Sequence, residues 1–95
     1  MLDLNKLCGM NGKTAIVTGA ASGIGAGIAR FFADAGVSVV IADINEELAR
    51  KVEKEINDAG GHAEFMRCDV TKEADCKAVA DAVAAKYPRI DILVN

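Results

Sequence analysis

The hydrophobic residues of this 95-residue chain change their spacing twice before its midpoint. A continuous apolar run at 15–17 leads into the segment TGAASGIG at 18–25, in which three positions are glycine. Apolar residues then recur at the three- and four-residue intervals of a helix between 24 and 35, and a second apolar run at 37–41 ends close to Asp43. This pattern predicts a strand, a glycine-rich turn, a helix and a second strand whose tip carries a carboxylate.

Strands and helices are predicted to alternate to the end of the chain. We expect strands at 13–18, 38–42, 62–68 and 90–94, with helices at 23–35, from Asn45 to 59, and from Thr71 to 86. Asn45 and Thr71 are predicted N-caps, and Gly36 and the pair at 60–61 are predicted helix stops. The inward faces of the second and third helices are expected to be Leu48, Val52, Ile56 and Ala59, and Ala74, Ala78, Val79, Ala82 and Val83.

The order β-α-β-α-β-α-β predicts an α/β fold, a Rossmann-type doubly wound parallel sheet with strand order 3-2-1-4. The strand at 62–68 alternates apolar and polar residues more than the others do, which indicates an edge position. We expect a single dinucleotide-binding domain over 1–95, with 1–12 as an N-terminal arm. We also expect the domain to be truncated after the fourth strand, because a strand as apolar as 90–94 should not be an open edge.

The glycines of the turn point to a phosphate-binding site. Gly19 permits a sharp backbone turn, Gly23 removes a Cβ where a pyrophosphate must approach, and Gly25 lets the helix lie close to the strand. The amides of the first helical turn have no intrahelical partner and carry the positive end of the helix dipole. We therefore expect Ser22, Gly23, Ile24 and Gly25 to contact the pyrophosphate of a dinucleotide.

Asp43 is the predicted partner of the adenosine ribose diol, and a hydrogen bond to a charged acceptor contributes about 1.5–3 kcal/mol. Recognition of a 2′-phosphate would need a cation at position 22 or 44, and these positions hold Ser22 and Ile44. A carboxylate placed against a phosphate is unfavourable. The sequence therefore predicts NAD(H) rather than NADP(H) as the cofactor.

The run TGAASGIG resembles the signature of the short-chain dehydrogenase/reductase family, and the resemblance covers residues 13–95. The segment Cys68-Asp69-Val70-Thr71 is similar to the acidic position after the third strand of that family. The resemblance implies that Asp69 holds the amino edge of adenine with help from the Val70 backbone. From the residues alone, Asp69 could instead cap the turn into the third helix.

The last five residues, DILVN, look like the start of the D-x-L-V-N-N-A-G segment of the family. By resemblance, Asn95 would help to order the centre of the sheet beside the cofactor. Judged without the family, Asn95 could be an ordinary turn residue at the end of a strand.

The resemblance implies an NAD-dependent oxidoreductase that transfers a hydride between the nicotinamide and an alcohol/ketone pair, with this chain as its cofactor-binding part. The Ser, Tyr and Lys that move the proton in the family follow the N-A-G segment, so no catalytic residue is expected in this chain. Tyr87 does not match the Y-x-x-x-K motif, because Asp91 stands four residues on, and His62 starts a strand at the far end. Steroids, sugars or polyols, and 3-oxoacyl thioesters are all plausible substrates, and the complete protein is expected to be a homodimer or homotetramer.

Alternatives remain open from the residues themselves. One is a non-catalytic NAD-binding fragment or module, and a weaker one is a methyltransferase-like domain that binds S-adenosylmethionine. A tight strand-to-helix turn without any ligand is a third. A Walker-type phosphate loop is excluded, because no Lys-Ser or Lys-Thr pair follows the glycines.

Composition adds limits on partners and compartment. A net charge of −3 with mixed acids and bases suggests neither a nucleic-acid nor a membrane surface, and no apolar run reaches the length of a membrane helix. The N-terminus lacks the apolar core of a signal peptide. The odd set Cys8, Cys68 and Cys76, without C-x-x-C spacing, predicts separate thiols, no metal site and a cytoplasmic location.

Overall fold

The computed structural model describes residues 12–88 and 90–94, so the predictions for the arm before Gly12 and for Asn95 lie outside the described residues. In chain order the elements are β1 (Thr14–Thr18), α2 (Gly23–Asp34), β2 (Ser38–Asp43), α3 (Glu46–Asp58), β3 (His62–Arg67), α4 (Glu73–Lys86) and β4 (Ile92–Val94). Their number, type and order are those that the hydrophobic pattern predicts.

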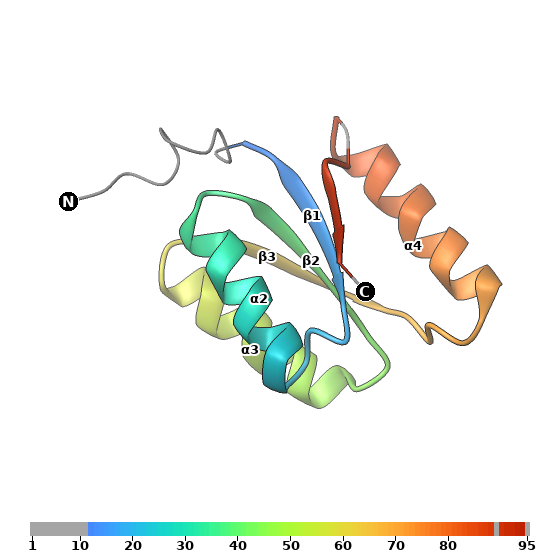
Figure 1. Ribbon diagram of the computed structural model, residues 1–95, viewed down its shortest axis with the longest axis horizontal. Helices are drawn as coiled ribbons and strands as arrows, with labels where there is room; N and C mark the ends of the chain where they lie inside the picture. Colours follow the sequence, from blue (N-terminus) through green and yellow to red (C-terminus); the bar gives the residue numbers. More distant parts are fainter. Residues whose placement is uncertain (1–11, 89, 95) are drawn as a thin grey trace.

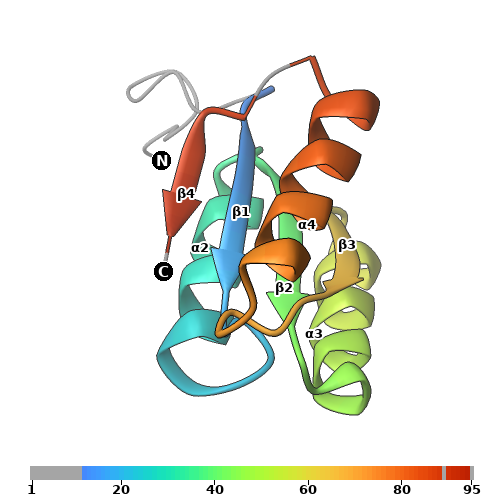
Figure 2. The same cartoon turned by 90° about the vertical axis from the view of Figure 1, so that its right-hand side faces the viewer.

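The strands form one parallel sheet in the order β3-β2-β1-β4, which confirms the predicted Rossmann-type arrangement. Helices α2 and α3 lie on one face of this sheet, and α4 lies on the other (Figures 1 and 2). Because all strands run in parallel, their carboxyl ends meet at one rim, and the β1–α2, β2–α3 and β3–α4 connections gather there. The predicted edge position of β3 is correct.

Alternate residues of the central strands face two separate cores. Val17 and Ile41 pack under α2 and α3, whereas Ile16, Val40 and Ala42 pack under α4. Burial on both faces explains why β1 and β2 are continuous apolar runs without an alternating pattern.

The fully buried residues of helix α2 are all small. Ala26, Ala29 and Ala33 are buried, whereas Ile24 is 84% exposed and Phe31 is 57% exposed. Of the large residues at helical spacing, Ile28 and Phe32 pack partly against the same core, whereas Ile24 and Phe31 do not.

The predicted inward faces of the other two helices are partly wrong. Val52 and Ile56 of α3 are buried as expected, but Ala49 is buried in place of Leu48 and Ala59, which are both exposed. In α4 only Val79 and Val83 are buried. Ala74, Ala78 and Ala82 are exposed, because α4 contacts the sheet along a narrow line.

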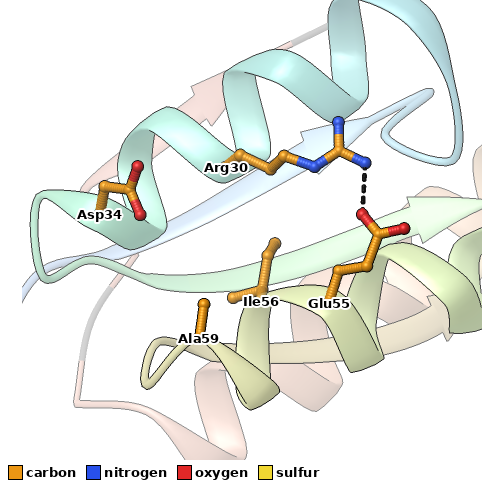
Figure 3. A pocket seen from close by; sticks show the side chains of 5 residues that line it. All are labelled: Arg30, Asp34, Glu55, Ile56 and Ala59. Atoms are coloured by element: carbon orange, nitrogen blue, oxygen red, sulfur yellow. Dashed lines mark hydrogen bonds and ion pairs between the residues drawn. The ribbon is translucent and has the colours of Figure 1, made fainter.

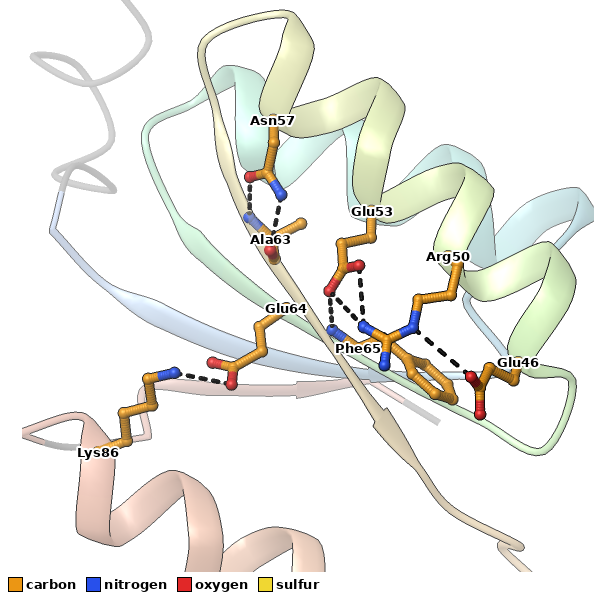
Figure 4. A network of polar contacts seen from close by, with 8 residues as sticks. All are labelled: Glu46, Arg50, Glu53, Asn57, Ala63, Glu64, Phe65 and Lys86. Carbon is orange, nitrogen blue, oxygen red and sulfur yellow. Dashed lines mark hydrogen bonds and ion pairs between the residues drawn. The ribbon is translucent and has the colours of Figure 1, made fainter.

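The outer edge of β3 is covered by side chains of α3 (Figure 4). The Phe65 amide donates to Glu53 Oε2 at 2.7 Å, and Asn57 accepts from the Ala63 amide at 2.9 Å and donates to the Ala63 carbonyl at 3.0 Å. The guanidinium of Arg50 lies 4.9 Å from the centroid of the Phe65 ring. These contacts satisfy backbone groups that an edge strand would otherwise offer to another chain.

Candidate functional site

The turn between β1 and α2 lies at the carboxyl rim of the sheet and requires glycine at two positions. Gly19 has φ +65° and Gly23 has φ +60°, values that residues with a Cβ rarely adopt. The Gly19 amide donates to the Ala42 carbonyl at 2.9 Å, which holds the start of the turn against β2. The predicted sharp turn at Gly19 is confirmed.

Gly25 is glycine for a different reason. A Cβ built on Gly25 would lie 2.0 Å from the Gly19 carbonyl oxygen and 2.7 Å from the Gly19 carbonyl carbon. The first turn of α2 therefore rests directly on the backbone of the preceding turn, which confirms the predicted close packing. No side chain could enter that contact without moving the backbone.

The amino end of α2 faces the same rim. Ser22 is its N-cap in an extended conformation, and the Ser22 side chain makes no capping hydrogen bond. The amides of the first turn, which Gly23, Ile24 and Gly25 begin, have no intrahelical acceptor, and the helix dipole adds partial positive charge there. This end of the helix offers donors to an anion.

Asp43 ends β2 and joins two turns. Its Oδ2 accepts a hydrogen bond from the Ala21 amide at 3.1 Å, and its Oδ1 accepts one from the Asn45 amide at 2.9 Å. The carboxylate is thereby held in one place at the rim, with its remaining lone pairs available to a ligand. The sequence predicts only a binding role for Asp43, because no local pattern reveals that its carboxylate also positions the glycine turn.

An open groove of about 330 Å³ lies between the ends of β2 and β3. Asp43 and Ile44 line one part of it, and Asp69 and Val70 line another. Ile44 and Val70 are 55% and 57% exposed, so the groove presents two apolar side chains beside two carboxylates. Gly19 of the glycine turn lines it as well, so the structure brings together five of the predicted site residues from three separate connections.

Asp69 is engaged within its own turn. Its Oδ1 accepts from the Thr71 hydroxyl at 2.6 Å and from the Thr71 amide at 3.0 Å, and its backbone amide donates to Asp75 Oδ2 at 3.1 Å. The hydrogen bond from the Thr71 hydroxyl, followed by that from the amide, lowers the pKa of the Asp69 carboxyl below its ordinary value. The predicted cap at Thr71 is wrong, because Lys72 occupies the N-cap position and Thr71 bonds to Asp69 instead. The alternative role for Asp69, ordering the turn before α4, is present in the structure.

His62 and Tyr87, which the sequence does not predict to be catalytic, lie at the opposite rim. The Tyr87 hydroxyl lies 3.0 Å from His62 Nε2 and donates to Glu64 Oε2 at 3.0 Å. Burial, followed by the Glu64 carboxylate, raises the pKa of Tyr87 to about 12. Tyr87 packs against the core under α4, which confirms that it is a packing residue.

A second hollow, of about 120 Å³, lies between α2 and α3 and is lined by Arg30, Asp34, Glu55, Ile56 and Ala59 (Figure 3). The Arg30–Glu55 ion pair, 2.6 Å between Nη2 and Oε2, bridges the helices beside it. This hollow does not adjoin the glycine turn or the groove.

Among the residues that the structure describes, no helix has the length and apolar character needed to cross a membrane.

The family model of the short chain dehydrogenases matches residues 13–95, and the chain belongs to that family. The chain is 50% identical over 86 residues to the 7alpha-hydroxysteroid dehydrogenase of Escherichia coli K12, covering 90% of this chain and 34% of that protein. It is 49% identical to the D-threitol dehydrogenase of Mycolicibacterium smegmatis, covering 90% of this chain and 33% of that protein. The chain thus spans about a third of the length of the curated relatives it matches.

Solved structures of the family share the fold. A 7alpha-hydroxysteroid dehydrogenase complexed with NADH and 7-oxo glycochenodeoxycholic acid gives a TM-score of 0.87 at 50% identity, over 90% of this chain and 34% of that chain. A metagenomic short-chain oxidoreductase in complex with NADP gives a TM-score of 0.85 at 43% identity, over 88% of this chain and 38% of that chain. Similar folds in this family therefore accept either nicotinamide dinucleotide.

Proposed function

We propose that this chain is the cofactor-binding part of an NAD(H)-dependent oxidoreductase that interconverts an alcohol and a ketone. The observation that carries the proposal is the fixed carboxylate of Asp43 in a groove that adjoins the glycine turn. This arrangement offers an acceptor to a ribose diol on one side and helix amides to a pyrophosphate on the other.

The residues present fit a dinucleotide. Ser22 and Gly23 at the amino end of α2 are exposed, so a phosphate can reach the first amides of the helix. The exposed side chains of Ile44 and Val70 suit the two sides of an adenine ring. Asp69 is predicted to meet the amino edge of that ring. When bound, the nicotinamide would supply or accept the hydride, and the residues of this chain would bind and orient its adenosine diphosphate portion.

The choice of NAD over NADP rests on charge. Because two backbone amides hold the Asp43 carboxylate, it cannot readily turn away from a 2′-phosphate. Position 44 supplies an apolar side chain where a cation would be needed. Two exposed cations also lie near this rim: Arg67, the register partner of Asp43 on β3, and Lys72, the N-cap of α4.

The test is a titration of NADH and NADPH into the protein as its host cell produces it, followed by fluorescence of the reduced nicotinamide. We expect NADH to bind at least about tenfold more tightly, a difference of about 1.4 kcal/mol. Ile44→Arg should narrow this difference, and Ile44→Leu, the matched control, should not. If the natural protein bound NADPH more tightly than NADH, the proposal would be contradicted. Loss of that NADPH binding in Arg67→Ala would then show that Arg67 binds the 2′-phosphate.

The reaction and substrate are part of the same proposal, because the chain covers only about a third of the relatives it matches. Steroid and polyol relatives make a 7-oxo bile acid and a tetritol the first compounds to assay for oxidation or reduction with NAD(H). Turnover of either supports a dehydrogenase. NADH binding without turnover of any alcohol or ketone tested would favour a non-catalytic nucleotide-binding module. A homo-oligomeric state and a cytoplasmic location remain predictions, which sedimentation and cell fractionation would test.

A further inference from the structure

We propose that Cys68 and Cys76 form a reversible disulfide on exposure to a hydroperoxide, and that this disulfide weakens nucleotide binding in the adjoining groove. The formation of the disulfide stands on the geometry of the two thiols alone. Its effect on binding rests on the function proposed above.

The two thiols are already neighbours, although seven residues separate them. Cys68 follows β3 and is 3% exposed, whereas Cys76 lies in the first turn of α4 and is exposed. The Cys68 thiol donates towards the Cys76 sulfur at 4.0 Å. A disulfide bond needs the sulfurs about 2.05 Å apart, so they must approach by about 2 Å, which a side-chain rotation with a small shift of the helix end would supply.

An apolar cavity of about 180 Å³ gives the thiols both space and access. It lies between α4 and the sheet, and Cys68 and Cys76 line it together with Ile16 and Val79. Cys68 also lines the groove that holds Asp43 and Asp69. The Cys68 thiol therefore stands between the cavity and the candidate binding site.

The unequal burial of the thiols assigns their roles. Burial raises the pKa of Cys68 to about 11, so this thiol keeps its proton at neutral pH. The exposed Cys76 is the group that meets a peroxide. After its thiol gives a proton to solvent, the thiolate attacks one peroxide oxygen and breaks the O–O bond; Cys76 becomes a sulfenic acid, and the other oxygen leaves as hydroxide, which takes that proton back from solvent as water. The Cys68 sulfur then attacks the Cys76 sulfur, and the sulfenic oxygen leaves as a second water that takes up the Cys68 proton. Two thiols and one hydrogen peroxide thus give one disulfide and two waters.

The segment between the cysteines is the turn that carries Asp69 and Val70. This turn is held by hydrogen bonds from the Asp69 amide to Asp75 Oδ2 at 3.1 Å and from the Cys76 amide to the Lys72 carbonyl at 3.2 Å. The Cys76 thiol also donates to the Val70 carbonyl at 3.9 Å. Closing the disulfide removes this last contact and draws the start of α4 towards β3, which displaces the Asp69–Val70 wall of the groove.

The first readout is a peptide map of the protein as its host cell produces it, reduced and then treated with one equivalent of hydrogen peroxide. Trypsin cuts after Arg67, Lys72 and Lys77, so the disulfide joins the peptides 68–72 and 73–77. Free thiols are alkylated before digestion. We expect this linked pair in the oxidised sample, its loss after dithiothreitol, and the same result in a Cys8→Ser variant. Absence of the linked pair, or a sulfinic acid on Cys76 in its place, would overturn the disulfide.

The second readout is the affinity for NADH before and after oxidation. We expect oxidation to weaken binding by at least about fivefold, the lower end of common coupling between sites, and dithiothreitol to restore it. Cys76→Ser, which replaces an exposed thiol, should bind NADH like the reduced protein and should not respond to peroxide. A linked peptide pair with unchanged NADH affinity would overturn the coupling to the groove. If the reduced protein bound no nucleotide, the proposed function would fail, and the peptide map would still decide whether the disulfide forms.

Discussion

Gly25→Ala, compared with Gly27→Ala, tests the close contact on which the glycine turn is built. Both positions lie in α2 and both substitutions add one methyl group. A Cβ at Gly25 would lie 2.0 Å from the Gly19 carbonyl oxygen, whereas a Cβ at Gly27 meets nothing within 4 Å. The pair therefore separates the contact from the general effect of alanine in a helix.

The size of the effect follows from these distances. Real Cβ contacts shorter than 3.0 Å are essentially never seen, so at Gly25 the helix and the turn must separate by about 1 Å. Backbone atoms form the contact, and no side-chain rotation can relieve it. Gly27→Ala should stabilise the protein by about 0.5–1 kcal/mol through helix propensity. The free energy of unfolding of Gly25→Ala should be about 1–3 kcal/mol lower than that of Gly27→Ala, which is the usual cost of overpacking.

The assay is urea unfolding followed by far-ultraviolet circular dichroism, together with a titration of NADH. Separation by 1 Å also moves the amides of the first helical turn away from the pyrophosphate. Loss of one hydrogen bond to a charged group, about 1.5–3 kcal/mol, would weaken NADH binding by about tenfold or more. A Gly25→Ala protein as stable as Gly27→Ala would refute the packing argument, and unchanged NADH affinity in a destabilised Gly25→Ala would refute the placement of the phosphate.

Three further predictions concern polar contacts. Asp43→Asn leaves one acceptor for two amides, so it should lower the free energy of unfolding by about 1–2 kcal/mol in urea titrations, and an unchanged midpoint would contradict this. The hydrogen bond from Lys86 lowers the pKa of Glu64 below its ordinary 4.5. The ionised Glu64 therefore stabilises the folded protein fully above pH 4.5, and this contribution is lost as the pH falls through the lowered pKa of the folded state. Glu64→Gln should therefore cost about 0.5–1 kcal/mol at pH 7 and nothing in acid, and a difference that persists at low pH would exclude this cause. Glu53→Ala should expose the Phe65 amide at the β3 edge and promote association of the protein, which light scattering would detect. Glu47→Ala, a control on the exposed side of α3, should scatter light like the natural protein.

The sequence by itself determined the features that depend on neighbouring residues. Continuous apolar runs, helical spacing and glycines at stops and turns are local, and they predicted the order of the elements and the strand order. The cap of α3 is an example, since Asn45 Oδ1 accepts from the Leu48 amide at 3.1 Å, three residues away. The positive φ of Gly19 and the close packing at Gly25 were likewise predictable, because the strand–turn–helix unit is contiguous in the chain.

Only the tertiary structure decided which groups from distant segments meet. Ala29 rather than Phe31 faces the sheet. Asp43 anchors the amide of Ala21, 22 residues earlier, and Cys68 stands 4.0 Å from the Cys76 sulfur across a turn. Such contacts depend on how whole elements pack against one another, and a pattern of residue types along one segment carries no information about the distance between two segments.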